Sequence, residues 1–302
     1  MSRSPSRRTL RRVAGVAAAV AAALTLAACS SGSSGSSTTS SAATSSASAA
    51  SSASASASKS SGPAASSSAA ASAAPGASGT LTVFAAASLK ATFTELGQTF
   101  EQQNPGTTVS FSFAGSSDLV TQLTGGAPAD VFASADENNM NKAVTGGVIE
   151  GTPVNFASNI LTIVTQPGNP KGITGFADLA NPDLQVVVCA PQVPCGSATT
   201  QVETNTGVTL TPVSQESSVT DVLNKVTSGQ ADAGLVYVTD AKNAGDKITE
   251  VPFPEAATVV NVYPIATVKN APQPALAGKF IALVTGPDGQ QILKDAGFEP
   301  AP

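Results

Sequence analysis

The folded part of this sequence predicts an α/β protein with mainly parallel sheets, long enough for two lobes. Short apolar runs alternate with segments whose apolar residues recur at helical spacing from Thr80 onward. This alternation is typical of parallel sheets in which a helix follows most strands. Residues 79–302 supply the length for two such lobes, and no internal repeat is visible.

The first half of the folded part begins with a strand and a helix. Residues 81–86, LTVFAA, form an uninterrupted apolar run typical of a buried strand. Apolar residues then recur at helical spacing: Leu89, Phe93, Leu96 and Phe100. A strand, a helix that ends at glycine and a third strand are predicted next: TVSFSFA (108–114), GSSDLVTQLTGG (115–126) and ADVFASA (129–135).

The second half continues the alternation. Residues 159–165 and 184–190 are apolar enough for central strands. Ser218 then begins a helix as its N-cap, with Asp221 three residues later and Gly229 just past the end. Two strands and two helices complete the prediction: AGLVYVTDA, ending near Tyr237, VVNVYPIATV (259–268), ALAGKFIALVTG (275–286) and DGQQILKDAGF (288–298).

The N-terminus has the layout of a lipoprotein export signal. All five arginines lie in the first twelve residues, and an uncharged run from Val13 to Ala28 ends at Cys29. The sequence LAAC resembles a bacterial lipobox, which predicts that residues 1–28 are removed and that Cys29 is lipidated. The run SRRTLR also resembles a twin-arginine export signal, and either export route leads outside the cytoplasm. A permanent transmembrane helix is the weaker alternative, since sixteen residues fall short of the roughly 20 that span a bilayer.

Residues 29–78 are predicted to form a disordered tether. After Cys29 they are almost entirely Ser, Ala, Thr and Gly, with one charge at Lys59. Such a segment has too little apolar bulk to offset the entropy of ordering. A flexible coil of this length reaches roughly 40 Å, enough to hold a globular domain above a membrane. Low-complexity filler without this role would have the same composition.

Charge and composition disfavour several classes of function. Removal of the predicted signal takes away all five arginines and leaves ten lysines against twenty acidic residues, a net charge of −10. Nucleic acid is therefore not an expected partner. The chain has no histidine, the commonest general base and metal ligand. Cys189 and Cys195 are expected to form a disulfide in an oxidising compartment. This bond would close a short loop, and we expect it to shape the loop more than to stabilise the fold.

Serines at the starts of helices suggest an anion-binding site. Ligands of open α/β sheets bind beyond the carboxyl ends of strands, where helices begin. A helix N-terminus exposes unpaired N–H groups and the positive end of the helix dipole. Ser88 follows three alanines that let a ligand approach the backbone, Ser116 lies at a second such turn, and ESSVTD (216–221) offers a third. A single serine at a helix start is more often an ordinary N-cap, so the prediction depends on the three occurring together.

Four further motifs occur in order along the chain: TVFAAASL, FAGSSDL, GAPADVFASAD and GLVYVTDA. Together they resemble the molybdate-binding (ModA-like) proteins of bacterial ABC importers, which are receptors of the type II periplasmic-binding-protein family. The resemblance covers residues 80–299 and includes the closing GPDGQQILKDAGF. It implies two lobes joined by a hinge, the first formed by residues 79–158 and 259–302 and the second by residues 159–258. It also implies a binding protein that is not an enzyme and needs no cofactor.

The resemblance also implies which residues contact the ligand. Family members hold a tetrahedral oxyanion through two serine hydroxyls, backbone amides and a tyrosine hydroxyl. These roles fall on the hydroxyls of Ser88, Ser116 and Tyr237 and on the N–H groups of Cys195 and Val219. No side chain is expected to bind the metal atom directly. Cys195 departs from the family, which commonly has a small residue at this position, and its side chain can bond to Cys189 if only its amide contacts the ligand.

The charged residues near these motifs have structural explanations. Asp118 complements the dipole in the first turn of its helix. Asp130 is expected to fix a turn, and Asp136 is expected to cap the following helix. Lys90 is expected to be a solvated lysine in a first helical turn, although it could pair with the ligand.

The predicted contacts are all hydrogen-bond donors. Molybdate, tungstate and sulfate are fully deprotonated dianions near neutral pH and only accept hydrogen bonds, whereas phosphate keeps a proton that needs an acceptor. No acidic residue occupies the five positions, so phosphate is disfavoured. The resemblance alone selects molybdate, with tungstate as its near-isostere, and a receptor for sulfate remains the alternative.

We therefore predict a monomeric receptor, anchored through Cys29 to the outer face of the cytoplasmic membrane. It captures molybdate or tungstate and delivers the oxyanion to the permease of an ABC importer with its ATPase. A distant alternative is an exported serine hydrolase, but no histidine exists to activate Ser88 and no G-x-S-x-G surrounds it. An adhesive surface domain is a further alternative, and it would bind no oxyanion.

Overall fold

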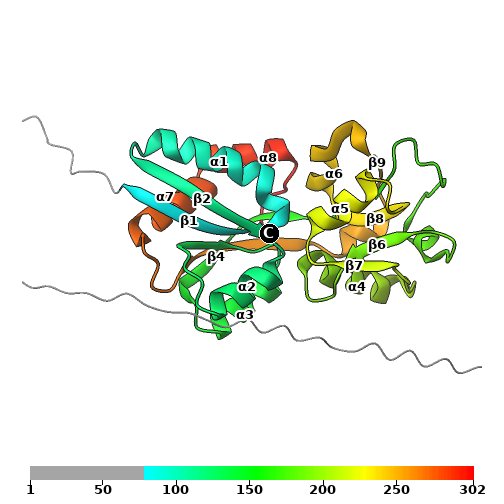
Figure 1. The fold of residues 1–302 in the computed structure, drawn as a ribbon, viewed down its shortest axis with the longest axis horizontal. Helices are drawn as coiled ribbons and strands as arrows, with labels where there is room; N and C mark the ends of the chain where they lie inside the picture. Colours follow the sequence, from blue (N-terminus) through cyan, green and yellow to red (C-terminus); the bar gives the residue numbers. More distant parts are fainter. Residues whose placement is uncertain (1–77) are drawn as a thin grey trace, which may run out of the picture. The chain divides into compact units, whose positions relative to one another are not determined.

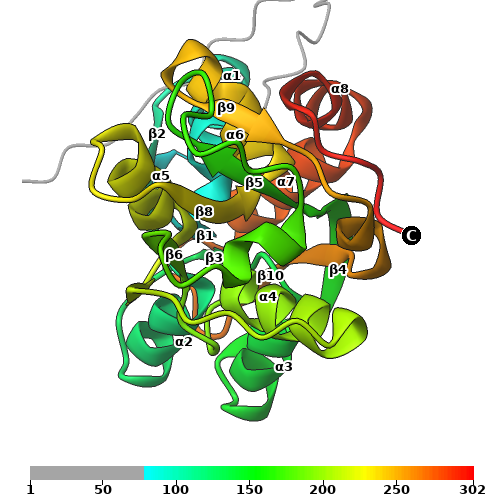
Figure 2. The same cartoon turned by 90° about the vertical axis from the view of Figure 1, so that its right-hand side faces the viewer.

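A computed structural model of the chain describes residues 78–302. The predicted leader, Cys29 and the tether up to residue 77 lie outside the described residues. Residues 78–302 contain two five-stranded sheets, each covered by helices (Figures 1 and 2). None of the helices in this part of the chain is long and apolar enough to cross a membrane.

The first sheet begins with the predicted apolar run. β1 (Gly79–Ala86) lies parallel to both of its neighbours, β2 (Thr107–Ala114) and β3 (Val131–Ala133). β10 (Asn261–Val268) lies between β3 and β4 (Ile149–Asn159) and is antiparallel to both. The strand order is therefore β2-β1-β3-β10-β4.

Helices cover both faces of the first sheet because its central strands are apolar on both sides. Val83 of β1 belongs to the core formed with α1, α7 and α8, whereas the next residue, Phe84, belongs to the core formed with α2 and α3. This sheet and its helices are called the first lobe below. The helices are α1 (Lys90–Gln103), α2 (Ser116–Thr124), α3 (Glu137–Thr145), α7 (Pro274–Thr285) and α8 (Pro287–Ala296).

The second sheet has the order β7-β6-β8-β5-β9. β6 (Val186–Cys189) is parallel to β7 (Ser214–Glu216) and β8 (Ala233–Tyr237). β5 (Leu161–Thr165) is antiparallel to β8 and to β9 (Thr249–Val251). β5 and β6, the two strands predicted to be central, are both internal.

One continuous core joins the second sheet to its helices. This sheet and its helices are called the second lobe. Its helices are α4 (Pro194–Thr206), α5 (Val219–Thr227) and α6 (Val238–Ala244), with short 3-10 turns η2 (Phe176–Ala180), η3 (Gly245–Lys247) and η4 (Pro254–Thr258).

The chain crosses between the lobes at two neighbouring places. The first crossing leads from β4 directly into β5 at Ile160, and the second leads from η4 through Val260 into β10. Asn159 and Asn261, at the two crossings, are paired residues of β4 and β10. Two short adjacent connections of this kind are a natural place for a hinge.

Strand orientation is mixed, although the sequence predicts mainly parallel sheets. The pairs made by β1 with its neighbours and by β6 with its neighbours are parallel. The pairs made by β10 and by β5 are antiparallel. The difference arises at the crossings, because β5 and β10 enter their sheets from the other lobe and have no helix to reverse the chain.

We expect Phe280→Ala to lower the free energy of unfolding by about 3–5 kcal/mol, because it empties a fully buried site. Phe280 is completely buried, and its ring centre lies 5.4 Å from that of Phe100 and 5.9 Å from that of Phe93. Urea denaturation measures the loss. Val213→Ala is the control, since Val213 is 51% exposed and its change should stay within about 0.5 kcal/mol. Equal losses of unfolding free energy in the two variants would contradict the placement of Phe280 in the core.

Candidate functional site

A small cavity lies between the two lobes, where strands of both sheets end. Its free volume is ≈ 10 Å³, about the room for one water molecule. All five residues predicted to contact a ligand line it; that they bind one stays a prediction. The lining is Ala86, Ala87, Ser88, Gly115, Ser116 and Ala135 from the first lobe and Val193, Pro194, Cys195, Val219 and Tyr237 from the second.

The two serines of the first lobe lie where β1 and β2 end. Ser88 is in the 3-10 turn η1 (Ala87–Leu89), and its Oγ lies 3.1 Å from the hydroxyl of Tyr263. Ser116 is the first residue of α2 and is fully buried. Its Oγ accepts the N–H of Ala135 at 3.0 Å. Because a hydroxyl carries one proton and two lone pairs, the Ser116 proton stays available for the cavity.

Two helix starts of the second lobe bring backbone N–H groups to the cavity. α4 begins with Pro194, which has no N–H, so Cys195 has the first free amide of that helix. α5 begins at Val219 after the N-cap Ser218, whose Oγ accepts the N–H of Asp221 at 3.3 Å. The amide of Val219 precedes this capped group and has no partner within its helix. Both amides therefore suit an anion in the cavity.

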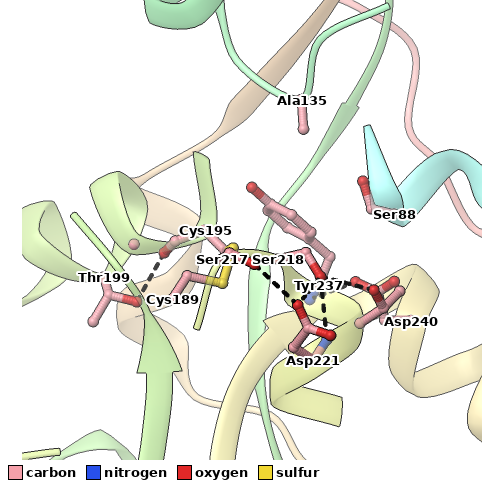
Figure 3. The surroundings of a disulfide bond; sticks show 12 residues. Ser88, Ala135, Cys189, Cys195, Thr199, Ser217, Ser218, Asp221, Tyr237 and Asp240 are labelled. Carbon is pink, nitrogen blue, oxygen red and sulfur yellow. Dashed lines mark hydrogen bonds between the residues drawn. A yellow bond between two sulfur atoms is a disulfide. The ribbon is translucent and has the colours of Figure 1, made fainter. Parts of the chain in front are cut away.

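Tyr237 is the last residue of β8, and it lines the cavity with its side chain. The side chain is 1% exposed, and its hydroxyl has no hydrogen-bond partner among the described residues. Figure 3 shows the ring extending into the space between Ser88, Ala135 and the disulfide. Burial, together with the nearby Tyr263, Asp136 and Asp240, raises the pKa of Tyr237 well above its ordinary value, so the hydroxyl stays protonated. A buried hydroxyl costs about 1–3 kcal/mol when it is unpaired, which a ligand acceptor would recover.

A disulfide holds the α4 side of the cavity. Cys189 at the end of β6 and Cys195 in the first turn of α4 are bonded, with Cα atoms 5.7 Å apart. Gly196 follows immediately, and a Cβ on this residue would overlap the carbonyl oxygen of Ala190. The Cys195 side chain is directed toward the bond (Figure 3), and Cys195 lines the cavity.

The cavity lining contains no charged side chain. Asp130 accepts the N–H groups of Thr82 and Gln273 at 2.7 and 2.6 Å, which ties β1 to the start of α7. Asp136 caps α3 by accepting the N–H of Asn139 at 2.9 Å, as the sequence predicted. Neither carboxylate lines the cavity, so the polar groups at its wall are hydroxyls and amides.

A larger cavity of ≈ 630 Å³ adjoins the small one and shares Ala87 and Ser88 with it. Lys90, Asp240 and Lys242 line this larger space. Lys90 therefore lies outside the small cavity, in agreement with its expected place as an exposed lysine of the first helical turn.

Asp240 is the buried carboxylate next to the Tyr237 backbone. Its Oδ2 accepts the N–H of Tyr237 at 3.1 Å and so fixes the start of α6. Burial raises the pKa of Asp240 to about 7, which the hydrogen bond from Tyr237 only partly offsets. The carboxyl group is therefore partly protonated near neutral pH.

Sequence reasoning did not identify Tyr263 as part of the site. Its hydroxyl positions Ser88, and its ring centre lies 6.0 Å from that of Tyr237. A signal was present, because the chain has only two tyrosines. Tyr263 lies within an otherwise apolar predicted strand, where a hydroxyl needs a partner.

Comparisons with known proteins agree with this fold. The family model of bacterial extracellular solute-binding proteins matches residues 81–299. The molybdate-binding protein ModA of Mycobacterium tuberculosis (strain H37Rv) is 58% identical over 219 residues, which cover 72% of this chain and 84% of that protein. ModA of Escherichia coli K12 is 32% identical over 231 residues, 73% of this chain and 89% of that protein.

A solved structure has the same fold. The periplasmic molybdate-binding protein of Azotobacter vinelandii superposes with a TM-score of 0.64 at 27% identity, covering 72% of this chain and 98% of that one. The predicted α/β architecture with two lobes is therefore confirmed.

The Tyr237 hydroxyl should contribute nothing to the stability of the ligand-free protein. We expect Tyr237→Phe to leave the free energy of unfolding unchanged or to raise it by up to about 1–3 kcal/mol, because it removes an unpaired buried group. Tyr263→Phe is the matched control and should lower it by about 0.5–1.5 kcal/mol, because it breaks the bond to Ser88. Urea denaturation of both variants tests this, and a loss for Tyr237→Phe as large as the control's would contradict it.

Asp240 should make the protein less stable as the pH rises from about 4 to about 7. Its folded-state pKa of about 7 exceeds the ordinary 3.8, so its contribution to stability is complete below pH 3.8 and is lost as the pH rises through about 7. Each pKa unit by which the folded state differs from the unfolded state corresponds to about 1.4 kcal/mol of stability. We expect Asp240→Asn to lack this loss and to be more stable than the unmodified protein at pH 8.

The control for this pH series is Asp178→Asn. Hydrogen bonds from Thr174 lower the pKa of the exposed Asp178, the opposite direction. At pH 8, Asp178→Asn should therefore be no more stable than the unmodified protein. An Asp240→Asn protein with the pH dependence of the unmodified chain would show that Asp240 is not the group responsible.

Proposed function

The chain belongs to the bacterial extracellular solute-binding proteins, and we propose that it is the molybdate receptor of an ABC importer, with tungstate as an equivalent ligand. The oxyanion would bind between the lobes and be released to a membrane permease. One observation carries the proposal: five residues that can donate hydrogen bonds, from both lobes, line a single cavity without a charged side chain, and these are Ser88, Ser116, Cys195, Val219 and Tyr237.

The donor set matches a fully deprotonated dianion. Hydroxyls and free amides can all donate to oxyanion oxygens, and the starts of α2, α4 and α5 add the positive ends of helix dipoles. A hydrogen bond to a charged group contributes about 1.5–3 kcal/mol. Several such bonds in a site closed to water can therefore offset the desolvation of a small dianion without a cation.

A receptor for sulfate is the second candidate because its ligand accepts the same hydrogen bonds. The donor chemistry of the cavity does not separate the two ions, which differ in size. The relatives with the higher identities favour molybdate, since both are molybdate-binding proteins. Competition between molybdate and sulfate for the same protein distinguishes the candidates directly.

The protein performs no reaction, as expected for its family. A serine hydrolase would need a base beside its nucleophile. The side-chain partner of the Ser88 hydroxyl is Tyr263, and the chain contains no histidine. Ser88 is therefore equipped to donate a hydrogen bond and not to attack a substrate.

Export follows from the family, and we propose the finer details from the sequence. Residues 1–28 would be the signal, Cys29 the lipidated residue and residues 29–78 the tether that leaves a monomeric receptor free to reach its permease. We further propose that residues 79–158 and 259–302 move as one lobe and residues 159–258 as the other. The separate sheets and their two crossings support this division.

Titration calorimetry of the exported protein with sodium molybdate tests the proposed function. We expect binding with a stoichiometry of one, and competition by tungstate at the same site. Absence of heat with both anions, together with no shift of the melting temperature, would refute the proposal.

Ser88→Ala combined with Ser116→Ala should weaken molybdate binding by several kcal/mol. Each replacement removes a hydrogen bond to a charged group, worth about 1.5–3 kcal/mol, and a factor of ten in affinity corresponds to about 1.4 kcal/mol. Ser228→Ala is the control, because Ser228 is exposed at the end of α5 and bonds only within that helix region. A double variant with the affinity of the control would place the binding site elsewhere.

A further inference from the structure

We propose that Gly115 sets how far the two lobes close, because its missing side chain makes room for the backbone of Ser217 in the opposite lobe. This role rests on the proposed receptor function and belongs to a residue that donates no side-chain contact to the ligand. Gly115 would act as a positioning residue: it allows the donors of the two lobes to reach the same oxyanion.

The two segments meet backbone to backbone at the cavity. Gly115 joins β2 to α2 in the first lobe, and Ser217 joins β7 to α5 in the second. A Cβ built on Gly115 would overlap the carbonyl oxygen of Ser217 and lie 3.3 Å from the carbonyl carbon. The same Cβ would lie 3.4 Å from Cγ1 of Val193, an ordinary van der Waals distance, so the carbonyl oxygen of Ser217 is the group that occupies the space a side chain would need.

The local conformation of Gly115 does not require glycine. Its φ of −59° and ψ of 139° are open to every residue. It is also the N-cap of α2, a position where Ser, Thr, Asp and Asn stabilise a helix. α3 and α5 do have such caps, in Asp136 and Ser218, whereas α2 has no side-chain cap. The close approach of the other lobe accounts for the glycine, and the helix loses a capping side chain as a result.

Two hydrogen bonds between the lobes are instead donated by side chains. Asn139 donates to the carbonyl oxygen of Gln192 at 3.3 Å. On another part of the interface, Lys242 of α6 donates to the carbonyl oxygen of Asp295 in the last turn of α8 at 2.7 Å. Rotation of the long Lys242 side chain can release its contact. A methyl group on Gly115 would meet backbone atoms, which only a shift of a whole segment can move.

The neighbours of this contact are the proposed ligand donors. Ser116 follows Gly115 directly, and Val219 lies two residues after Ser217. Any separation of Gly115 from Ser217 therefore moves the Ser116 hydroxyl away from the Val219 amide. Hydrogen bonds weaken steeply once their atoms move apart, so an anion held by one lobe would lose donors from the other.

The test compares Gly115→Ala with Gly278→Ala in the full chain with its disulfide intact. Gly278 is exposed in α7, and a Cβ there would meet no atom within 4 Å. We expect Gly115→Ala to weaken molybdate binding about 10- to 100-fold, the loss of about one hydrogen bond to a charged group. X-ray scattering should show less ligand-induced compaction for this variant, while its ligand-free melting temperature stays close to that of the unmodified protein. Gly278→Ala should bind and compact like the unmodified protein.

Gly115→Ser separates closure from helix capping. The serine hydroxyl could cap α2 but carries the same Cβ, so we expect binding at least as weak as in Gly115→Ala. Three results would overturn the proposal: Gly115→Ala with unchanged affinity and compaction, a lowered ligand-free melting temperature that explains its weaker binding, or restored binding in Gly115→Ser. If the unmodified protein binds no molybdate, the proposed function fails, and the same comparison with sulfate then decides the closure proposal.

Discussion

The proposed function places one constraint on the whole structure: a doubly charged anion would have to be taken out of water by groups that carry no formal charge. The cavity between the lobes has hydroxyls and amides at its wall and no lysine, and arginine occurs only in the first twelve residues of the chain. Partial charges of this kind are effective only when they are fixed in place and point at one position. Precise placement of donors from several segments would thus replace the attraction of a single cation.

The α/β fold supplies that placement from local rules. Parallel strands such as β1 and β2 end at the same edge of a sheet, so the helices that follow them begin side by side. The second lobe repeats the arrangement with β6 and β7 before α4 and α5. Neither lobe alone surrounds an ion, and the two adjacent crossings near Asn159 and Asn261 let the two sets of helix starts face each other. In the proposed receptor, closure would be the step that assembles the site, which would give a residue such as Gly115 influence over binding without a contact of its own.

Apolar patterns in the sequence predicted the strands and helices that have such patterns strongly. The resemblance supplied the five residues that line the cavity. β4 was not predicted, because only its last four residues are buried and the rest lacks an apolar pattern. α4 was also missed, since its sequence PCGSATTQVETNT has little apolar periodicity. The contacts of Tyr263 with Ser88 and of Gly115 with Ser217 join residues far apart in the chain, and propensity and periodicity describe only neighbours along it.

The most direct measurement is a crystal structure of the protein grown with sodium molybdate, with data collected at the molybdenum absorption edge. Anomalous scattering locates the metal independently of how the surrounding density is interpreted. We expect one strong peak in the cavity, with oxyanion oxygens at hydrogen-bond distance from the hydroxyls of Ser88, Ser116 and Tyr237 and the amides of Cys195 and Val219. A peak beside Lys90 and Lys242 in the larger cavity, or no ordered molybdenum between the lobes, would contradict binding by uncharged donors.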